Sequence, residues 1–438
     1  MIVNFSIQNF CSIRDKIQLS FEATNSDDLD EYYINKDNEK GLRILKFGLI
    51  YGANASGKTT ILNALDFLRN LVLEPNDKKT GLLHLKPFLF DETSSKENTF
   101  LSIEFIQNKV KYLYELELNE NAVIKEKLQY FNPNKALVFS RKTDVEKQLT
   151  IIEEIGSKII LSKEHKIALE TNTLWNNTVL GGFLKTNIDS FELQETVDWF
   201  RNKLKPIITP KTNLFGFVTD KIEENEIDKN NVIKILNKAD FNITDITINK
   251  SLVDISSEFF NFLSDRMKYS DDELKKLKDE KSVSRELLFH HNIENTGEFS
   301  LPYSAESAGT QRYYQLGGIL ELMIKSQSIF LIDEIESSLH PDLLKYFLLT
   351  FLVNSKDSQI IATTHHRELL MERDIFRNDV IWFTELQKNG STDLFSLSDF
   401  DSSVIRNTSS VYNAYKIGKL GARPNLNDYF IELEDEQK

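Results

Sequence analysis

Cysteine is nearly absent from the 438-residue sequence. The single residue, Cys11, cannot form a disulfide within the chain, which indicates a reducing compartment. We expect Cys11 to be a small buried hydrophobe on or near an N-terminal strand. Long apolar runs are also missing. No run could span a bilayer, and residues 1–7 alternate like a strand instead of resembling a secretion signal. We therefore expect a cytoplasmic protein that does not enter a membrane.

A net positive charge is absent as well. The 53 lysines and arginines are outnumbered by 67 aspartates and glutamates, which gives a formal net charge of -14. Because phosphate backbones dominate binding to nucleic acids and anionic membranes, the whole molecule should bind them poorly without specificity. A local basic groove is compatible with this total, so nucleic acid stays open as a partner. With 40% hydrophobic residues, the chain can build two or three domain-sized units.

The most informative segment is residues 51–60, which contains the pattern G-x-x-x-x-G-K-T directly after an apolar, strand-like run. A polyphosphate needs backbone N–H groups at close range, which Gly52 and Gly57 permit, followed by a helix N-terminus. Lys58 supplies a cation for the β- and γ-phosphates, and the Thr59 hydroxyl can ligate Mg²⁺. Apolar residues then recur at helical spacing, at Ile61, Leu62, Leu65, Leu68 and Val72. Strand, loop and helix follow in the order of a phosphate-binding loop.

A second informative segment is the apolar run 329–332, which ends in Asp333 and Glu334. A central parallel strand presents acids in this way at its carboxyl edge, where ligands of open α/β sheets bind. Asp333 would hold Mg²⁺ through its water shell, and Glu334 would polarise a water for in-line attack on the γ-phosphate. The alternative is that the paired acids only cap the following segment.

The sequence divides into three parts by its texture. In residues 1–124, strand patterns surround the phosphate loop, and alternating segments after it predict an antiparallel β meander. Residues 125–286 carry charged, Asn- and Lys-rich helical patterns, so we expect a mostly helical insertion. In residues 287–438, strands alternate with helices, which predicts a parallel sheet. The predicted strands are residues 2–7, 17–21, 87–90, 100–106, 112–118, 287–293, 328–332 and 359–363.

Two adjacent glycines, Gly317 and Gly318, lie inside a predicted helix of the third part. Each should cost about 1 kcal/mol relative to alanine. We expect close packing against a neighbouring element to require them.

Taken together, these motifs resemble those of ABC-type and SMC-like ATPases, and more narrowly those of the AAA-labelled ATPases of bacterial abortive-infection systems, the RloA/AbiL-like group. The resemblance covers most of the chain and is strongest at the nucleotide motifs. The segments that carry it are 9–14 (NFCSIR), 54–59 (NASGKT), 306–312 (ESAGTQR), 333–334 (DE), 336–341 (ESSLHP), 363–365 (TTH) and 418–424 (GKLGARP). It implies an α/β P-loop NTPase fold of ABC/SMC-like type, with a β meander lobe and a mostly helical insertion.

The resemblance also implies an ATP- and Mg²⁺-dependent dimer or higher homo-oligomer. In that assembly Ser307, Gly309 and the following helix N-terminus would contact a γ-phosphate held by the partner's loop, although a plain helix cap would look the same. His365 would be the switch histidine that senses the γ-phosphate, with His366 as the alternative by one position. No glutamine loop can be placed. The expected nucleotide-binding residues are Gly52, Asn54, Ser56, Gly57, Lys58, Thr59, Thr60, Ser307 and Gly309; Thr59 and Asp333 would serve the metal, and Glu334 and His365 catalysis.

Three short patterns point elsewhere but lack support. Residues 237–240 match the guanine-reading N-K-x-D motif, but the run before them fits a helix as well as a strand and no D-x-x-G switch accompanies it, so we prefer ATP. Residues 399–401 have the spaced acids of a metal nuclease, but we expect no further acid-bearing strand after His365. His290 and His291 have no other ligand nearby at metal-binding spacing, so we assign them to an ordinary strand.

The leading interpretation is a cytoplasmic ATPase that acts as a sensor or regulator in anti-phage defence and controls a separate effector protein. One alternative is an SMC-like ATPase of DNA maintenance, against which the acidic balance and the lack of long coiled-coil arms both count. Another is a nucleotide-gated scaffold with little turnover, which a comparison of ATP binding with ATP hydrolysis would distinguish.

Overall fold

The computed structural model describes residues 1–35, 41–253, 282–293, 297–372, 375–400, 411–416 and 419–422. The chain divides into two units. The first comprises Met1–Thr212, Met323–Ser337 and Phe347–Lys438, and the second comprises Asn213–Leu322 and Ser338–Tyr346.

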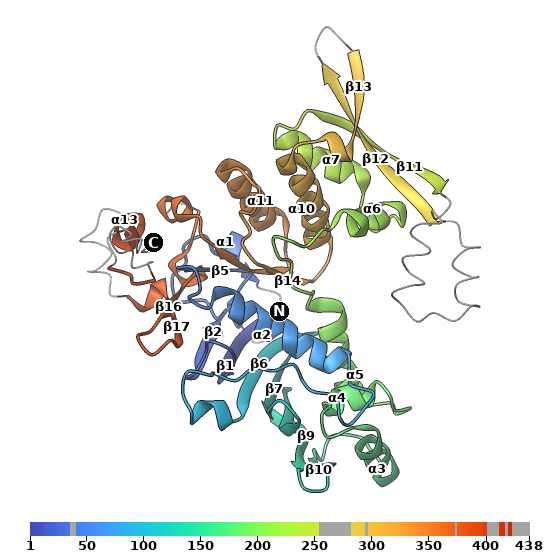
Figure 1. Ribbon diagram of the computed structural model, residues 1–438, viewed down its shortest axis with the longest axis vertical. Coiled ribbons are helices and arrows are strands. Elements are labelled where there is room, and N and C mark those ends of the chain that lie inside the picture. Colours follow the sequence, from blue (N-terminus) through green and yellow to red (C-terminus); the bar gives the residue numbers. More distant parts are fainter. Residues whose placement is uncertain are drawn as a thin grey trace, which may run out of the picture. The chain divides into compact units, whose positions relative to one another are not determined.

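An antiparallel sheet in the first unit contains the expected meander, with strand order β10-β9-β8-β7-β6-β1-β2 among the described residues (Figure 1). Every second residue of β6 is buried, as its alternating sequence predicts. Phe105 of β6 stacks on Trp199 with ring centroids 4.1 Å apart, so the π-helical turn Trp199–Lys203 covers this strand. The strands are β1 (Ile2–Gln8), β2 (Ile17–Ser20), β6 (Thr99–Gln107), β7 (Val110–Leu118), β8 (Val123–Phe131), β9 (Lys135–Asp144) and β10 (Leu149–Ile155).

The expected change to helical structure at residue 125 is wrong, because this residue lies inside β8 and the meander continues to the end of β10. The many charged residues in these strands led to the helical expectation. Several of them lie on the exposed face of the sheet. Helices follow in the first unit, including the short α4, which contacts α2. These helices are α3 (Lys163–Asn172), α4 (Val179–Phe183) and α5 (Phe191–Asp198).

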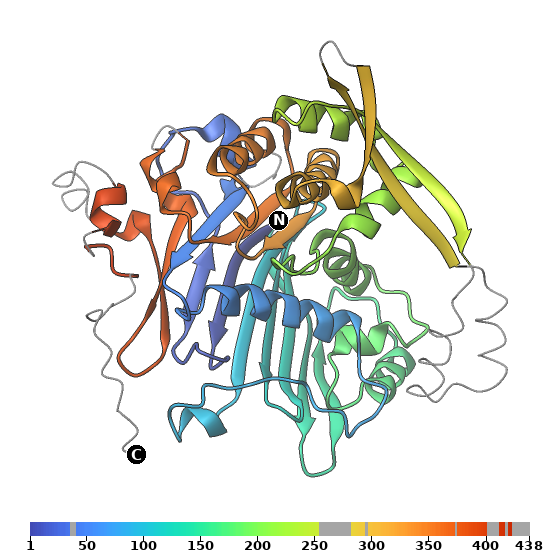
Figure 2. The same cartoon turned by 45° about the horizontal axis from the view of Figure 1, so that its top comes forward.

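The second sheet of the first unit is the parallel sheet that the third part of the sequence predicts. Its strand order is β14-β15-β5-β16-β17, parallel except for the last pair. Helix α2 (Lys58–Leu73) follows β5 and contacts β5 and β15; Figure 2 shows it running across the strands of the antiparallel sheet. The strands are β5 (Phe47–Gly52), β14 (Ile329–Ile332), β15 (Gln359–Thr364), β16 (Ile381–Leu386) and β17 (Thr392–Ser396). The remaining elements of this unit include α1 (Asp30–Tyr33), β3 (Ile34–Asn35), β4 (Ile44–Leu45) and α13 (Val411–Lys416).

Three smaller expectations for the first unit are also wrong. Residues 87–90 are irregular, because Phe88 N donates to the side chain of Asn9 at 2.9 Å instead of joining a strand ladder. Cys11 is exposed, because it lies in the turn between β1 and β2 with a φ of 51°. Acid-bearing strands do follow His365, since β16 contains Glu385 and β17 contains Asp393.

The second unit contains a sheet with strand order β11-β12-β13 and helices on the chain before and after it. The run at 232–236, which fitted a helix or a strand, is part of helix α7, so the N-K-x-D pattern ends a helix. His290 and His291 lie in β12, as expected. The elements are α6 (Phe215–Glu223), α7 (Lys229–Lys238), β11 (Ile243–Val253), β12 (Ser282–Ile293), β13 (Gly297–Pro302), and the helices α10 (Ala308–Lys325) and α11 (Pro341–Asn354), which begin in this unit.

Close packing explains one of the paired glycines in α10. A Cβ on Gly318 would lie 2.4 Å from a methyl of Val218 in α6, whereas one on Gly317 would lie 3.5 Å from Ile235, an ordinary contact. We expect Gly318→Ala to lower the free energy of unfolding by about 1 to 3 kcal/mol through overpacking. Gly317→Ala, the matched control, should raise it by up to about 1 kcal/mol through helix propensity.

Urea unfolding curves of the two glycine variants and the unchanged protein would test this. Equal effects of the two substitutions would contradict the packing account, and Val218→Ala should relieve much of the cost in Gly318→Ala because it removes both methyl groups that the new Cβ meets.

Within the described ranges, no helix combines the length and the apolar character needed to cross a membrane.

Candidate nucleotide site

Three neighbouring strands carry the candidate residues at their carboxyl ends. The phosphate loop follows β5, Asp333 follows β14, and His365 follows β15, the strand between the other two. The strands are in register, with Thr363 beside Ile50. Because the carboxyl ends of parallel strands meet at one edge of the sheet, the fold brings the three segments together where open α/β sheets bind ligands.

The two glycines of the phosphate loop lie where a side chain would not fit. A Cβ on Gly52 would lie 2.3 Å from the hydroxyls of Ser56 and Thr384, and one on Gly57 would lie 2.2 Å from Oγ1 of Thr392. Gly57 also has a φ of 96°, which residues with side chains rarely adopt. Helix α2 begins with the next residue, so the loop backbone leads directly into a helix N-terminus, which favours anions.

The Lys58 ammonium bends back over this loop. Its Nζ donates to the carbonyl oxygens of Gly52 at 3.1 Å and Ala53 at 2.9 Å. Burial lowers the pKa of Lys58, and the carboxylates of Asp333 and Glu334 oppose this effect. The loop therefore carries a cation whose N–H groups point at its centre, which suits a polyphosphate.

Asp333 joins the phosphate loop although 274 residues separate it from Thr59. The Thr59 hydroxyl donates to Oδ1 at 2.9 Å and lies 3.1 Å from Oδ2, and the Thr363 hydroxyl donates to Oδ1 at 2.6 Å. Asp333 is buried, and its backbone N–H donates to the carbonyl of Ile208. A hydroxyl and a carboxylate at this separation are the oxygen donors that Mg²⁺ prefers at nucleotide sites.

Glu334 has a strained backbone and an accessible side chain. Its φ is 49°, in the left-handed region that residues other than glycine seldom adopt, and its side chain is 46% exposed. The backbone N–H of Glu334 donates to the Thr363 hydroxyl at 2.8 Å, which fixes the turn. Oε1 of Glu334 lies 4.0 Å from Nε2 of His365. Strain held by the surrounding structure is typical of functional sites.

The two adjacent histidines after β15 have different surroundings. The His365 imidazole faces Glu334, and burial and then the Lys58 charge lower the pKa of His365, while Glu336, Glu334 and Asp333 oppose this effect. The His366 imidazole lies instead 3.5 Å from the carboxylate of Glu368, in the 3₁₀ helix Arg367–Met371. Of the two histidines, His365 is therefore the one whose imidazole lies beside Glu334.

Comparison with known proteins places the chain in a family. The family model described as "AAA domain, putative AbiEii toxin, Type IV TA system" matches residues 49–372, which is well over half of the chain. The chain belongs to this AAA domain family. The match begins in β5, before the phosphate loop, and ends after His365, so it contains every candidate residue of this site.

Solved structures with a similar fold include the SMC head domain from Thermotoga maritima, with 13% identity, a TM-score of 0.39, and coverage of 90% of this chain and 98% of that one. Another is the SMC head bound to the C-winged helix domain of ScpA, with 14% identity, a TM-score of 0.42, and coverage of 90% and 97%. No curated protein matches the chain.

Ser307 and Gly309 of this AAA domain belong to the second unit, whereas the phosphate loop, Asp333 and His365 belong to the first. The Ser307 hydroxyl accepts a hydrogen bond from Thr310 N at 3.1 Å and lies 2.8 Å from the Thr310 hydroxyl. Ser307 thus has the geometry of a helix cap at the start of α10. Its role toward a phosphate held by a second copy stays a prediction.

Sequence reasoning missed the hydroxyls that support the phosphate loop of the AAA domain. Ser56 Oγ lies 2.6 Å from Thr384 Oγ1 in β16, and the Thr60 hydroxyl lies 3.2 Å from that of Ser12. Thr392 in β17 donates to the same Ser12 hydroxyl at 2.8 Å. The side chains of Ser56 and Thr60, two of the expected nucleotide-binding residues, are thus held by hydroxyls from other parts of the chain. The Asn54 side chain, in contrast, is exposed. A single threonine in a strand near the end of the chain, such as Thr384 or Thr392, cannot be assigned to the site from the sequence, because its neighbours depend on the strand order.

The short patterns that pointed elsewhere have structural explanations. Asp399 accepts a hydrogen bond from Ser396 N at 2.8 Å in a capping box, and Asp401 lies outside the described residues. His290 lies between the hydroxyls of Thr247 and Ser300, at 2.7 and 2.8 Å. Among the residues that the structure describes, no group of three or more His, Cys, Asp and Glu could hold a metal ion. Residues 418, 423 and 424 of the C-terminal motif also lie outside the described ranges.

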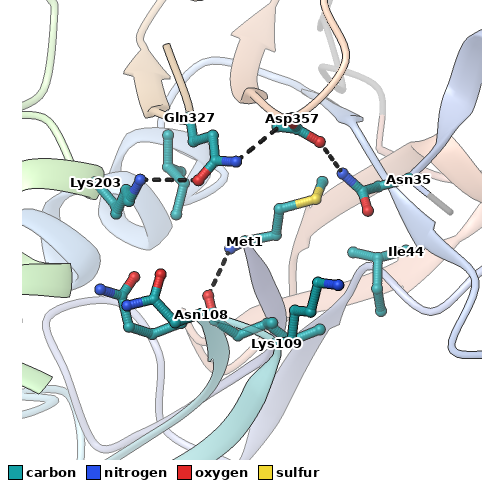
Figure 3. A pocket seen from close by; sticks show the side chains of 11 residues that line it. Met1, Asn35, Ile44, Asn108, Lys109, Lys203, Gln327 and Asp357 are labelled. Carbon is teal, nitrogen blue, oxygen red and sulfur yellow. Dashed lines mark hydrogen bonds between the residues drawn. The ribbon is translucent and has the colours of Figure 1, made fainter. Parts of the chain in front are cut away.

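A separate pocket of about 400 Å³ lies at the opposite edge of the parallel sheet, where β14 and β15 begin (Figure 3). Four of its polar side chains form a network: Asn35 and Gln327 both donate to Asp357, and Lys203 donates to Gln327 at 3.0 Å. This network joins the loops at the amino ends of the strands. The phosphate loop and Asp333, which suit a polyphosphate, lie at the other edge of the sheet, where these strands end.

Proposed function

We propose that this AAA domain binds and hydrolyses ATP with Mg²⁺. The observation that carries the proposal is the hydrogen bond between Thr59 and Asp333, which joins the lysine-bearing phosphate loop to the acidic end of β14. It lies within a single unit, beside Glu334 and His365. A helix N-terminus, a cation, a pair of metal-compatible oxygens and a carboxylate near a histidine together form the set that phosphoryl transfer needs.

Each group of residues in the site has a separate role in this proposal. The loop backbone from Gly52 to Gly57 and the Lys58 ammonium would bind and orient the phosphates. Thr59 and Asp333 would hold Mg²⁺, which would neutralise part of the phosphate charge. Glu334 would accept the proton of an attacking water, because its carboxylate is accessible and its turn is fixed by Thr363.

The larger role that we propose is that of a sensor or regulator in anti-phage defence. Two observations support it: the sequence resemblance to abortive-infection ATPases and membership of the family described as "AAA domain, putative AbiEii toxin, Type IV TA system". In this proposal two copies close around ATP, each presenting Ser307 and Gly309 to the other's phosphate loop, and the closure controls a separate effector protein. Turnover stimulated several-fold by DNA would instead favour a role in DNA maintenance.

The metal requirement gives a direct test. We expect ATP hydrolysis to stop when EDTA exceeds Mg²⁺, and we expect Thr59→Val to lower kcat/KM at limiting Mg²⁺ by about tenfold or more, because one metal-directed oxygen is lost. Thr59→Ser, the matched control, keeps the hydroxyl and should retain most activity.

Phosphate release assays over a range of Mg²⁺ concentrations would measure both effects. Hydrolysis that survives excess EDTA would contradict the metal-dependent mechanism. A Thr59→Val variant equal to the unchanged protein at limiting Mg²⁺ would contradict the role of Thr59.

A further inference from the structure

Glu336 connects the turn after β14 with the turn after β15. It lies three residues beyond Asp333, and its Oε1 accepts a hydrogen bond from the backbone N–H of His365 at 2.6 Å. This distance is short for an N–H donor, as expected when the acceptor is a carboxylate. The bond therefore ties the backbone of the proposed switch histidine directly to the segment that carries the proposed base.

Other hydrogen bonds between the same two turns surround this one. The backbone N–H of Glu334 donates to the Thr363 hydroxyl at 2.8 Å, and that of Ile335 donates to the Thr363 carbonyl at 3.1 Å. Those bonds hold the first turn against the end of β15. The bond to Glu336, by contrast, reaches one residue past the end of β15, to His365.

The second oxygen of Glu336 gives independent evidence of a functional constraint. Oε2 is buried and has no hydrogen-bond partner in the described part of the chain. A buried carboxylate oxygen left unpaired costs free energy, and native proteins keep few of them. Burial lowers the pKa of His365, the Lys58 charge adds to this, and Glu336 is the largest of the carboxylate influences that oppose it. The carboxylate thus lies close enough to act on the site electrostatically.

We propose that Glu336 is a positioning residue, which holds His365 beside Glu334 so that the imidazole meets the γ-phosphate in the transition state. This inference rests on the proposed ATPase function and adds a residue to its machinery. Glu336 acts through the backbone of His365, so its removal displaces the imidazole without removing any group that binds ATP. Displacements of about 1 Å can cost on the order of 100-fold in rate.

The neighbouring acid Glu368 supplies a matched control. It lies beside His366 at 3.5 Å, and its side chain is 61% exposed. Both glutamates thus lie next to a histidine of the same turn, but Glu336 contacts the backbone of His365 and Glu368 the imidazole of His366. Glu368→Ala should leave ATP turnover unchanged.

The experiment measures steady-state ATP hydrolysis by the full chain and four variants: Glu336→Ala, Glu336→Gln, His365→Ala and the double variant of Glu336→Ala with His365→Ala. We expect Glu336→Ala to lower kcat by at least about tenfold with less than about a threefold change in KM, because positioning acts mainly in the transition state. Glu336→Gln keeps an acceptor for the His365 N–H and should restore most of kcat. In the His365→Ala background, Glu336→Ala should have little further effect, because the two residues act as one unit.

Each outcome supports or overturns the proposal. Native kcat in Glu336→Ala, or full additivity of the two alanine substitutions, would overturn it. The proposal would also be overturned if Glu336→Gln hydrolysed ATP as slowly as Glu336→Ala while its urea midpoint was unchanged. The charge of Glu336, and not its hydrogen bond to His365, would then determine the rate. If Glu336→Ala unfolds, the Glu336→Gln result and its midpoint decide. An unchanged protein that binds ATP without hydrolysing it would refute the proposed function itself, whereas the other failures leave that function intact.

Discussion

Lys58→Ala is expected to lower the affinity for ATP by at least about 100-fold, because charge-assisted hydrogen bonds to phosphate are lost from a partly buried loop. The ammonium is already directed at the loop, donating to the carbonyls of Gly52 and Ala53. Desolvation lowers the pKa of Lys58, so the protein bears a cost for keeping this cation where it is. A bound polyphosphate would offset that cost.

Isothermal titration calorimetry of ATP in Mg²⁺ buffer would measure the loss. Lys111→Ala is a suitable control, since Lys111 is also partly buried and pairs with Glu104 at 3.5 Å on the antiparallel sheet. A binding curve for Lys58→Ala that matches the unchanged protein would remove the phosphate loop from the site. Urea midpoints of both variants would exclude unfolding as the cause.

The part of this site that the sequence predicts is the part built from contiguous residues. The phosphate loop and the acids after β14 each need a fixed local spacing, and both lie where the motifs indicate. The alternation of β6 and β7 likewise follows from one buried face. Such signals are local, so they can be recognised before any tertiary contact is known.

The expectation for residues 125–155 failed for a physical reason that the sequence cannot reveal. Glu126 and Arg141 are both fully buried and lie 3.8 Å apart in the antiparallel sheet. The Glu126 carboxylate accepts from the Tyr114 hydroxyl at 2.7 Å and from Val179 N at 2.7 Å, at the start of α4. Charged residues normally indicate a solvated face, and only their tertiary partners make this pair compatible with a core.

The hydroxyls around the phosphate loop were missed for a related reason. Thr384 and Thr392 become neighbours of the loop only because β16 pairs with β5 and β17 pairs with β16. Their contacts with Ser56 and Ser12 span more than 300 residues. A threonine in a strand is favoured by strand propensity alone, so its function appears only with the sheet order.

Glu334→Gln is expected to keep ATP affinity within about threefold of the unchanged protein while lowering kcat by about 100-fold or more, as removal of a general base does. Glutamine has nearly the same shape, so the turn with its φ of 49° and its bond to Thr363 should persist. What disappears is the carboxylate that lies 4.0 Å from the His365 imidazole. Because ATP then stays bound, any ATP-dependent dimer should accumulate, which sedimentation in ATP would show.

The comparison that decides the assignment is between this variant and Glu368→Gln, which changes an exposed acid beside the other histidine. Single-turnover hydrolysis separates the chemical step from product release. If Glu334→Gln cleaves bound ATP as fast as the unchanged protein, the base lies elsewhere and the strained turn needs another explanation. If Glu334→Gln and Glu368→Gln are both slow, loss of negative charge near the turn is enough to slow hydrolysis. The result would then give no support to Glu334 as the proton acceptor. A defect confined to Glu334→Gln would identify the accessible carboxylate at the end of β14 as the group that takes the proton.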